Sequence, residues 1–333
     1  MFKTISVIGA GGWGTALAIL LAGTRPTVRL WAHLPEHAEK LHASRENTDY
    51  LPGVSLPANI EVTNDLAAAA QADLLLMVVP SRAFREVAAK LAAAGLPSHA
   101  VLVSCTKGIE HDTGYLMTQV LADCLPGQRL AVLSGPNLAA EIARRVPAAC
   151  VVGSSHAEIL PALQDVFSVS SFRAYTSEDV SGIQLGGALK NVFAIAAGAS
   201  DGLGMGDNAK AALVTRALAE MTRLGVALGG RRETFAGLSG IGDLMVTCFS
   251  ARSRNRGFGE RLGRGETTAQ IQASMKMVAE GVPTSRSALQ CAQRLGVDAP
   301  IIAEVHAVLH EGKSPREGLL ALLDRPPKPE ADR

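Results

Sequence analysis

A single lysine occurs within a stretch whose other side chains are almost all apolar. Lys190 lies in residues 185–196, which predict a helix with apolar residues on nearly every face. An ammonium buried there costs on the order of several kcal/mol unless it is paired or its pKa falls. Lys190 is therefore a candidate general acid/base for interconverting a carbonyl and an alcohol, and Asn191 could fix a substrate hydroxyl. The alternative is a lysine whose charged end reaches water.

A glycine motif stands near the N-terminus. Residues 5–8 form a short apolar run, and Gly9, Gly11 and Gly14 follow in the spacing G-x-G-x-x-G before a helical pattern. Gly9 would allow a tight turn, Gly11 close approach of a pyrophosphate, and Gly14 packing of helix against strand. The helix N-terminus would face the phosphates, so the motif predicts a dinucleotide site.

The same region lacks charge from residue 4 to residue 24, which is also typical of a signal peptide or a membrane span. Four glycines there would weaken such a helix by roughly 1 kcal/mol each. We therefore expect no integral membrane association.

The second predicted strand bears on the cofactor. An NAD-specific site usually places Asp or Glu at its end to bind the ribose 2′-hydroxyl. Residues 30–34 contain no carboxylate, whereas Arg29 and His33 could tolerate a 2′-phosphate. We expect NADP(H) to be accepted beside NAD(H). The alternative for Arg29 is a side chain that points to solvent on an alternating strand.

A second glycine-rich segment could supply the partner of Lys190. Asp243 lies in residues 237–244, close to Thr247, and could pair with the ammonium and set its pKa. No Gly-Lys-Ser/Thr follows, so the segment is not a P-loop. Gly186 and Gly187, which weaken a helix interior, indicate close approach of the nicotinamide or of another helix.

A hydroxyl, a guanidinium and an amide follow one another at Ser253, Arg254 and Asn255, in a predicted loop before a helix. This arrangement suits a phosphate group. Nucleic acid is an alternative ligand for the arginines of this region, but aromatic residues are scarce among them and the net charge is only +1. A solvated charged surface is the other alternative.

Two predicted strands end in polar residues that should line one crevice. Lys107 follows the strand 101–104 and would bring a second cation beside the nicotinamide, and the turn 134–137 follows the next strand. Cys105 offers a thiolate nucleophile as an alternative, but no histidine lies near it in the sequence.

These groups must be held by an α/β domain followed by a helical one. Short apolar runs alternate with helical patterns up to about residue 180, which predicts a Rossmann-type, doubly wound parallel sheet covered on both faces. Helical patterns dominate thereafter. We expect an NAD(P)-binding domain over 1–180, an all-helical substrate and catalytic domain over 181–324, and a disordered tail over 325–333. The predicted strands are 5–8, 27–31, 74–79, 101–104, 130–133 and 149–152, and the longer predicted helices are 15–22, 66–71, 84–93, 182–197, 209–228, 268–279, 285–295 and 302–310.

Composition narrows the class of protein. The 333 residues are too many for one compact core, and 47% of them are hydrophobic. Five scattered cysteines without C-x-x-C spacing suit reduced thiols in a cytoplasm and no structural zinc. His306 and His310 could place two ligands on one helix face, but no third ligand is near, so no metal is expected.

Taken together, these residues resemble the bacterial NAD(P)-dependent glycerol-3-phosphate dehydrogenase family. The resemblance implies reversible reduction of dihydroxyacetone phosphate to sn-glycerol 3-phosphate, a precursor of phospholipids. It also implies a cytoplasmic homodimer that binds a phosphorylated triose and no nucleic acid. The matching stretches are 9–14, 30–33, 79–81, 106–108, 134–141, 184–191, 240–247 and 253–256.

The resemblance also assigns roles residue by residue. Lys190 is implied as the proton donor and acceptor, supported by Asp243, Lys107, Thr247 and Asn191. The implied substrate-binding positions are Lys107, Gly135, Asn137, Lys190, Asp243, Ser253, Arg254 and Asn255. The implied cofactor-binding positions are Gly9, Gly11, Gly12, Trp13, Gly14, His33, Lys107, Ala139, Arg254, Val278 and Glu280. Gly12-Trp13 and Asn137 depart from the residues most usual in the family.

Two other functions fit part of the pattern. A related two-domain reductase of β-hydroxy acids would need a cationic pocket for a carboxylate in place of the Ser-Arg-Asn phosphate site. A non-enzymatic NAD(P)-sensing protein would not need a buried lysine paired with Asp243.

Overall fold

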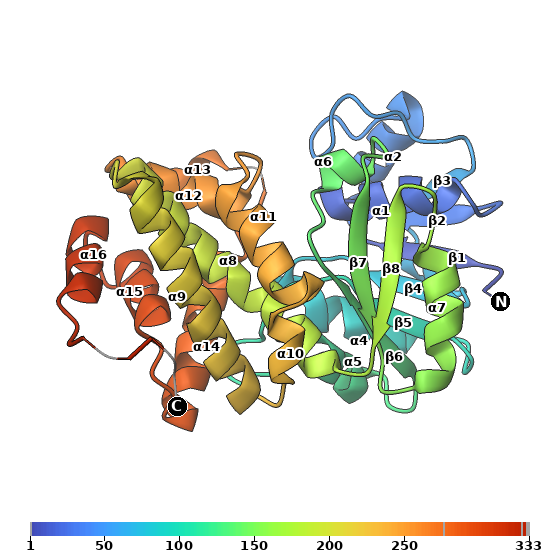
Figure 1. Cartoon of the computed structure of the whole chain (residues 1–333). Coiled ribbons are helices and arrows are strands. Elements are labelled where there is room, and N and C mark those ends of the chain that lie inside the picture. Colours follow the sequence, from blue (N-terminus) through green and yellow to red (C-terminus); the bar gives the residue numbers. More distant parts are fainter. Residues whose placement is uncertain (1, 276, 328, 331–333) are drawn as a thin grey trace. The chain divides into compact units, whose positions relative to one another are not determined.

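The chain divides into two compact units. The computed structural model describes residues 2–275, 277–327 and 329–330. One unit comprises Met1–Lys107 and Tyr115–Val180, and the other comprises Gly108–Gly114 and Ser181–Arg333 (Figure 1). The short segment 108–114 thus groups with the second unit, a difference from the continuous first domain expected from the sequence.

The first unit is built on one sheet. Its described strands follow the order β3-β2-β1-β4-β5-β6-β7-β8, and the strands β1 to β6 all run parallel to one another. The predicted doubly wound α/β fold is therefore confirmed. The bounds are β1 Ile5–Ile8, β2 Val28–Trp31, β3 Ile60–Thr63, β4 Leu74–Met77, β5 Val101–Ser104, β6 Arg129–Ser134, β7 Ala148–Gly153 and β8 Phe172–Ser177.

Three strands differ from the sequence prediction. β7, expected to continue the parallel sheet, runs antiparallel to β6, and β8 pairs with it in parallel. Neither β3 nor β8 was predicted as a strand. Only the first residue of β3 is buried, and β8 places exposed residues between buried ones, so both lack the continuous apolar run of the central strands.

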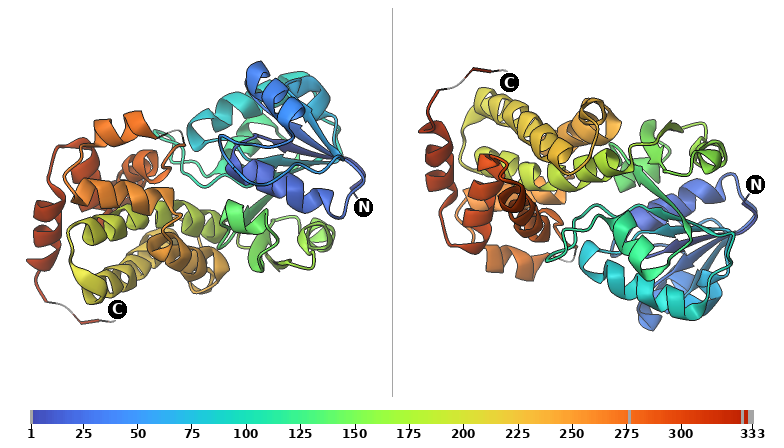
Figure 2. Two further views of the ribbon diagram at one scale, coloured as in Figure 1. Left: turned by 90° about the horizontal axis from the view of Figure 1, so that it is seen from above. Right: turned by 90° about the horizontal axis from the view of Figure 1, so that it is seen from below.

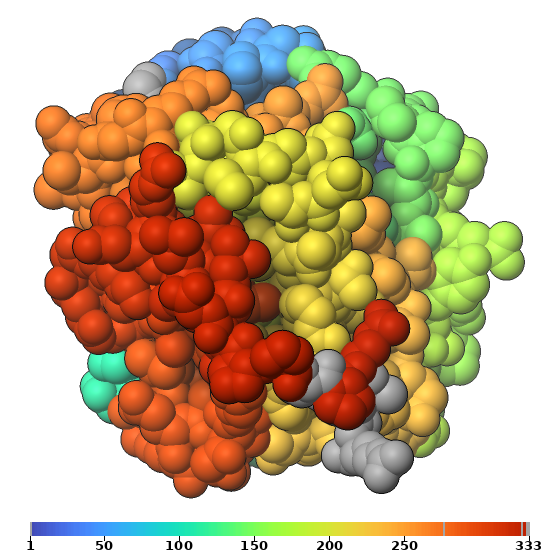
Figure 3. Space-filling view, turned by 60° about the vertical axis from the view of Figure 1, so that its left-hand side comes forward, coloured from blue at the N-terminus to red at the C-terminus, as the bar shows by residue number. Residues whose placement is uncertain are grey.

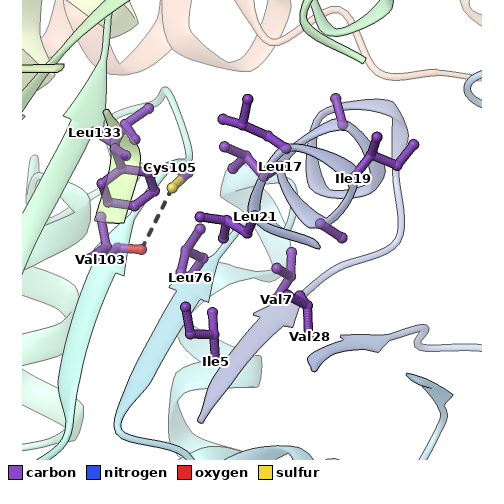
Figure 4. Close-up of a cluster of buried hydrophobic side chains, with 14 of the residues drawn as sticks. Ile5, Val7, Leu17, Ile19, Leu21, Val28, Leu76, Val103, Cys105 and Leu133 are labelled. Atoms are coloured by element: carbon purple, nitrogen blue, oxygen red, sulfur yellow. Dashed lines mark hydrogen bonds between the residues drawn. The ribbon is translucent and has the colours of Figure 1, made fainter. Parts of the chain in front are cut away.

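Helices cover both faces of this sheet. Leu17 and Leu21 of α1 pack against Val7 of β1 and Leu76 of β4 in one apolar cluster (Figure 4), and a second cluster includes Phe84 of α4. The helical elements are α1 Gly12–Ala22, α2 Pro35–Ser44, α3 Leu66–Ala70, the 3₁₀ turn Ser81–Ala83, α4 Phe84–Ala94, α5 Met117–Cys124, α6 Ala139–Ile142, the 3₁₀ turn Ala157–Ile159 and α7 Leu160–Phe167.

The second unit consists of packed helices (Figure 2). The helix predicted over 268–279 ends earlier, at Ser274. The elements are α8 Val180–Gly202, α9 Gly206–Ala227, α10 Arg232–Phe235, the π-helical turn Leu238–Gly242, α11 Asp243–Phe249, α12 Arg254–Gly263, α13 Thr268–Ser274, α14 Gly281–Leu295, α15 Pro300–His310 and α16 Pro315–Leu323.

Helix α8 is the central helix of this unit. Among the helices that the structure describes, it is long and apolar enough to cross a membrane by length and composition, and 83% of its apolar window is buried within the protein. Within the part of the chain that the structure describes, the other candidate is a bent pair, 232–249 with 254–263, if the two are taken as one span.

A buried carboxylate joins α9 to the C-terminal helices, which lie against α9 on the face shown in Figure 3. Glu220 accepts hydrogen bonds from the backbone N–H groups of Ile301 and Ile302, at 3.0 and 2.9 Å. These are first-turn donors of α15 that no residue of α15 itself can satisfy. Burial raises the pKa of Glu220 to about 7, and the two backbone hydrogen bonds partly oppose this shift.

The expected disordered tail lies partly outside the described residues, at 328 and 331–333. Within the described part, the Arg325 guanidinium donates to Asp298 at 2.7 Å.

Candidate active site

The glycine turn has the geometry that its sequence predicts. Gly9 has φ +123°, and a Cβ on Gly14 would lie 1.8 Å from the Gly9 carbonyl oxygen. Both positions therefore exclude a side chain. A Cβ on Gly11 would meet nothing within 4 Å, beside the first turn of α1. The open space and the helix N-terminus together fit a pyrophosphate.

An asparagine that the sequence gave no reason to single out braces this turn. Asn47 is buried, and its Nδ2 donates to the Ala10 carbonyl at 2.9 Å and to Thr15 Oγ1 at 2.7 Å. The same segment explains Gly12, where a Cβ would lie 2.7 Å from the Tyr50 carbonyl oxygen. Trp13 is half-buried against the core of this unit.

The end of β2 is less favourable to a 2′-phosphate than its sequence indicated. The Arg29 guanidinium donates to the Ala68 carbonyl at 2.8 Å and pairs with Glu61 at 3.4 Å. Arg29 thus neither points freely to solvent nor leaves its charge for a phosphate. His33 is exposed, edge-on to Trp31 with ring centroids 5.7 Å apart.

The loops after β5 and β6 meet, as their strand positions predict. Lys107 Nζ donates to the Gly135 carbonyl at 3.1 Å, and Gly135 has φ +140°. In the described part of the chain, the amide oxygen and nitrogen of Asn137 are both buried without a hydrogen-bond partner. A polar ligand at this turn would satisfy them. Ala139 begins α6 just beyond.

The thiol that follows β5 is not a nucleophile. Cys105 is buried, and burial together with the neighbouring Cys150 raises the pKa of its thiol. A reactive cysteine needs a lowered pKa and access, and Cys105 has neither. This alternative is therefore wrong.

The central group of the second unit is the lysine of α8. Lys190 is 6% exposed, and its Nζ donates to Asp243 Oδ1 and, at 2.8 Å, to Thr247 Oγ1. Asp243 is fully buried, and the Thr247 hydroxyl donates to the Asp243 carbonyl at 2.6 Å. The ammonium is paired inside the unit and does not extend into water, so a general acid/base with a fixed orientation is possible.

A π-helical turn brings Asp243 to this position. The Gly242 N–H donates to the carbonyl of Gly237, five residues earlier, at 3.1 Å, and α11 begins at Asp243. The turn packs directly on α8, since a Cβ on Gly186 would lie 2.4 Å from the Ser239 carbonyl oxygen. Of the two reasons considered for Gly186, the neighbouring backbone is the one observed.

The two asparagines bind each other. Asn255 Nδ2 donates to Asn191 Oδ1 at 2.9 Å, and Asn255 Oδ1 accepts from the Gly281 N–H at 2.9 Å. Both side chains are buried. The Asn255 amide, expected to bind phosphate, instead connects α8, α12 and α14. Its backbone N–H, in the first turn of α12, points out of the helix end.

The segment before α12 presents the other predicted phosphate-binding groups. Ser253 caps the helix, its Oγ accepting from the Arg256 N–H at 3.2 Å. Arg254 is exposed and donates to the Val278 carbonyl at 3.1 Å. The helix N-terminus and this guanidinium form an anion-binding arrangement. Glu280 follows Val278, at the start of α14.

The side chain of His310 contacts α14 through both of its ring nitrogens. His310 Nε2 lies 3.0 Å from Ser285 Oγ, and its Nδ1 accepts from Arg286 Nε at 3.3 Å. Both ring nitrogens are therefore engaged. Among the residues described, no three or more His, Cys, Asp or Glu side chains group so as to hold a metal.

A glycine turn on a parallel sheet and a buried lysine–carboxylate pair define the class, a nicotinamide-dependent oxidoreductase. Comparison with known proteins narrows it. Residues 4–160 match the sequence model of the NAD-dependent glycerol-3-phosphate dehydrogenase N-terminus, and residues 179–319 match that of its C-terminus. The chain belongs to this family, and the resemblance predicted from the sequence is confirmed.

Relatives cover the whole chain. It is 47% identical over 330 residues to a glycerol-3-phosphate dehydrogenase [NAD(P)+] of Chlorobium phaeobacteroides, covering 98% of each chain. It is 49% identical over 334 residues to the enzyme of that name from Geobacter metallireducens, covering 99% of each. The crystal structure of glycerol-3-phosphate dehydrogenase from Coxiella burnetii superimposes with a TM-score of 0.94 at 37% identity, over 97% of this chain and 99% of that one.

Proposed function

We propose that this protein catalyses the reversible NAD(P)H-dependent reduction of dihydroxyacetone phosphate to sn-glycerol 3-phosphate. The observation that carries the proposal is the buried group of Lys190, Asp243 and Thr247. A protein that only senses the cofactor would not need a buried ammonium paired with a carboxylate. Family membership and the names of the full-length relatives support the substrate.

The chemistry divides between the cofactor and the side chains. A nicotinamide dinucleotide whose pyrophosphate is held at the glycine turn would supply a hydride to the ketone carbon. Lys190 donates a proton to the alkoxide oxygen as it forms, and regains one from solvent before the next turnover. Asp243 and Thr247 orient the ammonium, because their oxygens accept two of its hydrogen bonds. Lys107 adds positive potential where negative charge develops.

The residues of the site divide into a cofactor set and a substrate set. We assign the cofactor to residues 1–180, at Gly9, Gly11, Gly12, Trp13, Gly14, His33, Lys107 and Ala139, with Arg254, Val278 and Glu280 as further contacts. We assign the substrate to Lys190, Asp243, Ser253, Arg254 and Asn255 of residues 181–324, with Lys107, Gly135 and Asn137. Asn255 contributes through its backbone, since its side chain binds Asn191 and Gly281.

The phosphate of the substrate has a defined role in this scheme. The Arg254 guanidinium and the first-turn N–H groups of α12 bind it, and this binding energy holds the carbonyl against Lys190. A hydroxy-acid reductase would have no such dependence on phosphate.

The cellular role follows from the product. We propose that the enzyme works in the cytoplasm as a homodimer and supplies glycerophospholipid synthesis. The five cysteines are all free thiols in the structure, in keeping with a reducing compartment. Light scattering after size-exclusion chromatography measures the mass of the assembly, which can be compared with the 34.7 kDa of one chain.

The proposal is tested by following NADPH oxidation with dihydroxyacetone phosphate. Unphosphorylated dihydroxyacetone and NADH serve as controls for substrate and cofactor. Rapid oxidation that requires the phosphate is expected. Folded protein that binds NADPH without turnover would overturn the proposal.

A further inference from the structure

A second buried lysine in the helical unit takes no part in the proposed reaction. Lys210 of α9 is 6% exposed, and its Nζ lies 2.7 Å from Asp201 Oδ2 and 4.7 Å from the centre of the Phe249 ring. The same carboxylate oxygen accepts from Arg256 Nε and from its terminal nitrogen, both at 2.7 Å. Asp201 therefore holds two cations.

Such a cluster is a poor device for stability alone. Removing charges from water costs about as much as their mutual attraction returns, and apolar side chains of similar size often serve equally well. The ion pairs do fix the orientation of the helices that carry them relative to one another. The Asp201 carboxylate can satisfy both cations only when α8, α9 and α12 are in one arrangement.

Two of these helices, α8 and α12, carry residues of the active site, and so does α11, which provides Phe249. Asp201 follows Lys190 by eleven residues on α8, which places it on the same helix face, about 16 Å along the axis. It therefore does not touch the reacting lysine. Arg256 lies in the first turn of α12, two residues after Arg254, and Phe249 is the last residue of α11.

The first turn of α12 is thus held from two sides. The Arg256 N–H donates to Ser253 Oγ at 3.2 Å, and its guanidinium is held by Asp201 and, at 3.2 Å, by Glu260. The backbone of this turn also lies directly against α8, since a Cβ on Gly198 would be 1.9 Å from the Arg256 carbonyl oxygen.

That close crossing extends along both helices. A Cβ on Gly259 would lie 1.9 Å from the Ile195 carbonyl oxygen, and a Cβ on Gly202 or Gly263 would lie 2.2 or 2.5 Å from a backbone oxygen of the other helix. The glycines fix the separation of α8 and α12, whereas they leave rotation about the helix axis unrestrained. The ion pair of Asp201 with Arg256 restrains this rotation, in addition to the hydrogen bond between Asn255 and Asn191.

We propose that Asp201, together with Lys210, is a positioning residue that orients the Ser253–Arg254–Asn255 turn and thereby sets the affinity for the phosphate of the substrate. The inference rests on the proposed function. It assigns the effect to substrate binding, because the cluster is remote from Lys190 along α8.

The test compares Asp201→Asn with a matched control, Glu304→Gln. Glu304 forms a partly buried ion pair with Lys313 at 2.6 Å in the same unit, near α16 and remote in sequence from α12. Asp201→Asn should raise the KM for dihydroxyacetone phosphate about tenfold and leave kcat within about twofold. Glu304→Gln should change neither. Inorganic phosphate, added without cofactor, should raise the melting temperature of wild type and of Glu304→Gln more than that of Asp201→Asn.

The outcomes separate this inference from the proposed function. Wild type that does not reduce dihydroxyacetone phosphate overturns both. Active wild type with an unchanged KM in Asp201→Asn, or with an equal change in Glu304→Gln, overturns the positioning role alone. If Asp201→Asn does not fold, Lys210→Met keeps most of the apolar stem and removes one charge. A rise of about threefold in its KM is then the expected result, and no rise overturns the role.

Discussion

The exchange of Lys190 for methionine tests the central group of the site most sharply. Methionine keeps most of the apolar stem and removes only the ammonium. Asp243, which is fully buried, then remains without its cation. Breaking a buried ion pair in this way costs about 3–5 kcal/mol. In a unit of this size each kcal/mol lowers the melting temperature by about 2–4 °C, so a fall of about 6–20 °C is expected.

The double variant Lys190→Met/Asp243→Asn separates stability from catalysis. It removes both charges, so most of the lost melting temperature should return. Turnover should not return, because loss of a general acid costs about 10²- to 10⁴-fold in rate whether or not the carboxylate is neutral. A lysine with only a structural role would behave differently, and the double variant would regain activity along with stability.

Three measurements decide between these readings. Circular dichroism gives the melting temperatures, NADPH fluorescence gives cofactor affinity, and NADPH oxidation gives kcat with dihydroxyacetone phosphate. Cofactor affinity should be nearly unchanged in both variants. Near-wild-type kcat in either variant would refute the acid/base role. A single variant as stable as the double one would refute the reasoning about the buried charge.

Four further predictions concern the rest of the protein. Gly11→Ala should weaken NADPH binding at least about tenfold without a change in melting temperature, because its Cβ meets open space in the protein; an unchanged Kd would remove the pyrophosphate from this turn. Gly14→Ala should instead lower the melting temperature, since its Cβ overlaps the Gly9 carbonyl. Arg254→Ala should raise the KM for dihydroxyacetone phosphate about 10- to 100-fold and affect kcat less, and an unchanged kcat/KM would exclude this residue from the site. Burial raises the pKa of Glu220 from 4.5 to about 7, so its stabilising effect is complete below pH 4.5 and is lost as the pH rises through 7. The melting temperature of Glu220→Gln should therefore rise relative to wild type over that range, and a difference independent of pH would contradict the assignment.

Local patterns were enough to predict the elements that carry the site. The central strands and the helix of Lys190 were predicted because elements buried on all sides have continuous apolar runs. Such runs can be recognised in a single sequence. The reversed direction of β7 was not predicted, since an apolar run is the same read along either direction. The strands β3 and β8 were missed for a different reason. Their half-exposed patterns are also typical of loops.

Side-chain identity predicted chemistry better than it predicted partners. Lys190 and Asp243 were matched because a buried charge must be compensated, and that requirement leaves few candidates. The amide of Asn255 carries no such requirement, so its bond to Asn191 could not be distinguished from a bond to substrate. Asn47 was missed for the same reason.

The close crossing of α8 and α12 did leave a signal in the sequence. Gly198 and Gly202 are four residues apart on one helix, and Gly259 and Gly263 are four apart on the other. Two such pairs in helical patterns indicate backbones in contact, because glycine otherwise weakens a helix.

Because of the π-helical turn before α11, activity depends on the number of residues in this segment as well as on their side chains. It holds one residue more than an α-helical turn would need. Deleting a residue between Gly237 and Asp243 would regularise the helix, turn α11 by about 100° and draw it back by about 1.5 Å. Asp243 and Thr247 would then move away from Lys190 together. A substitution at the exposed Ile241 would leave Asp243 in place, whereas inserting or deleting one residue in this segment would displace it from Lys190 and abolish the reaction.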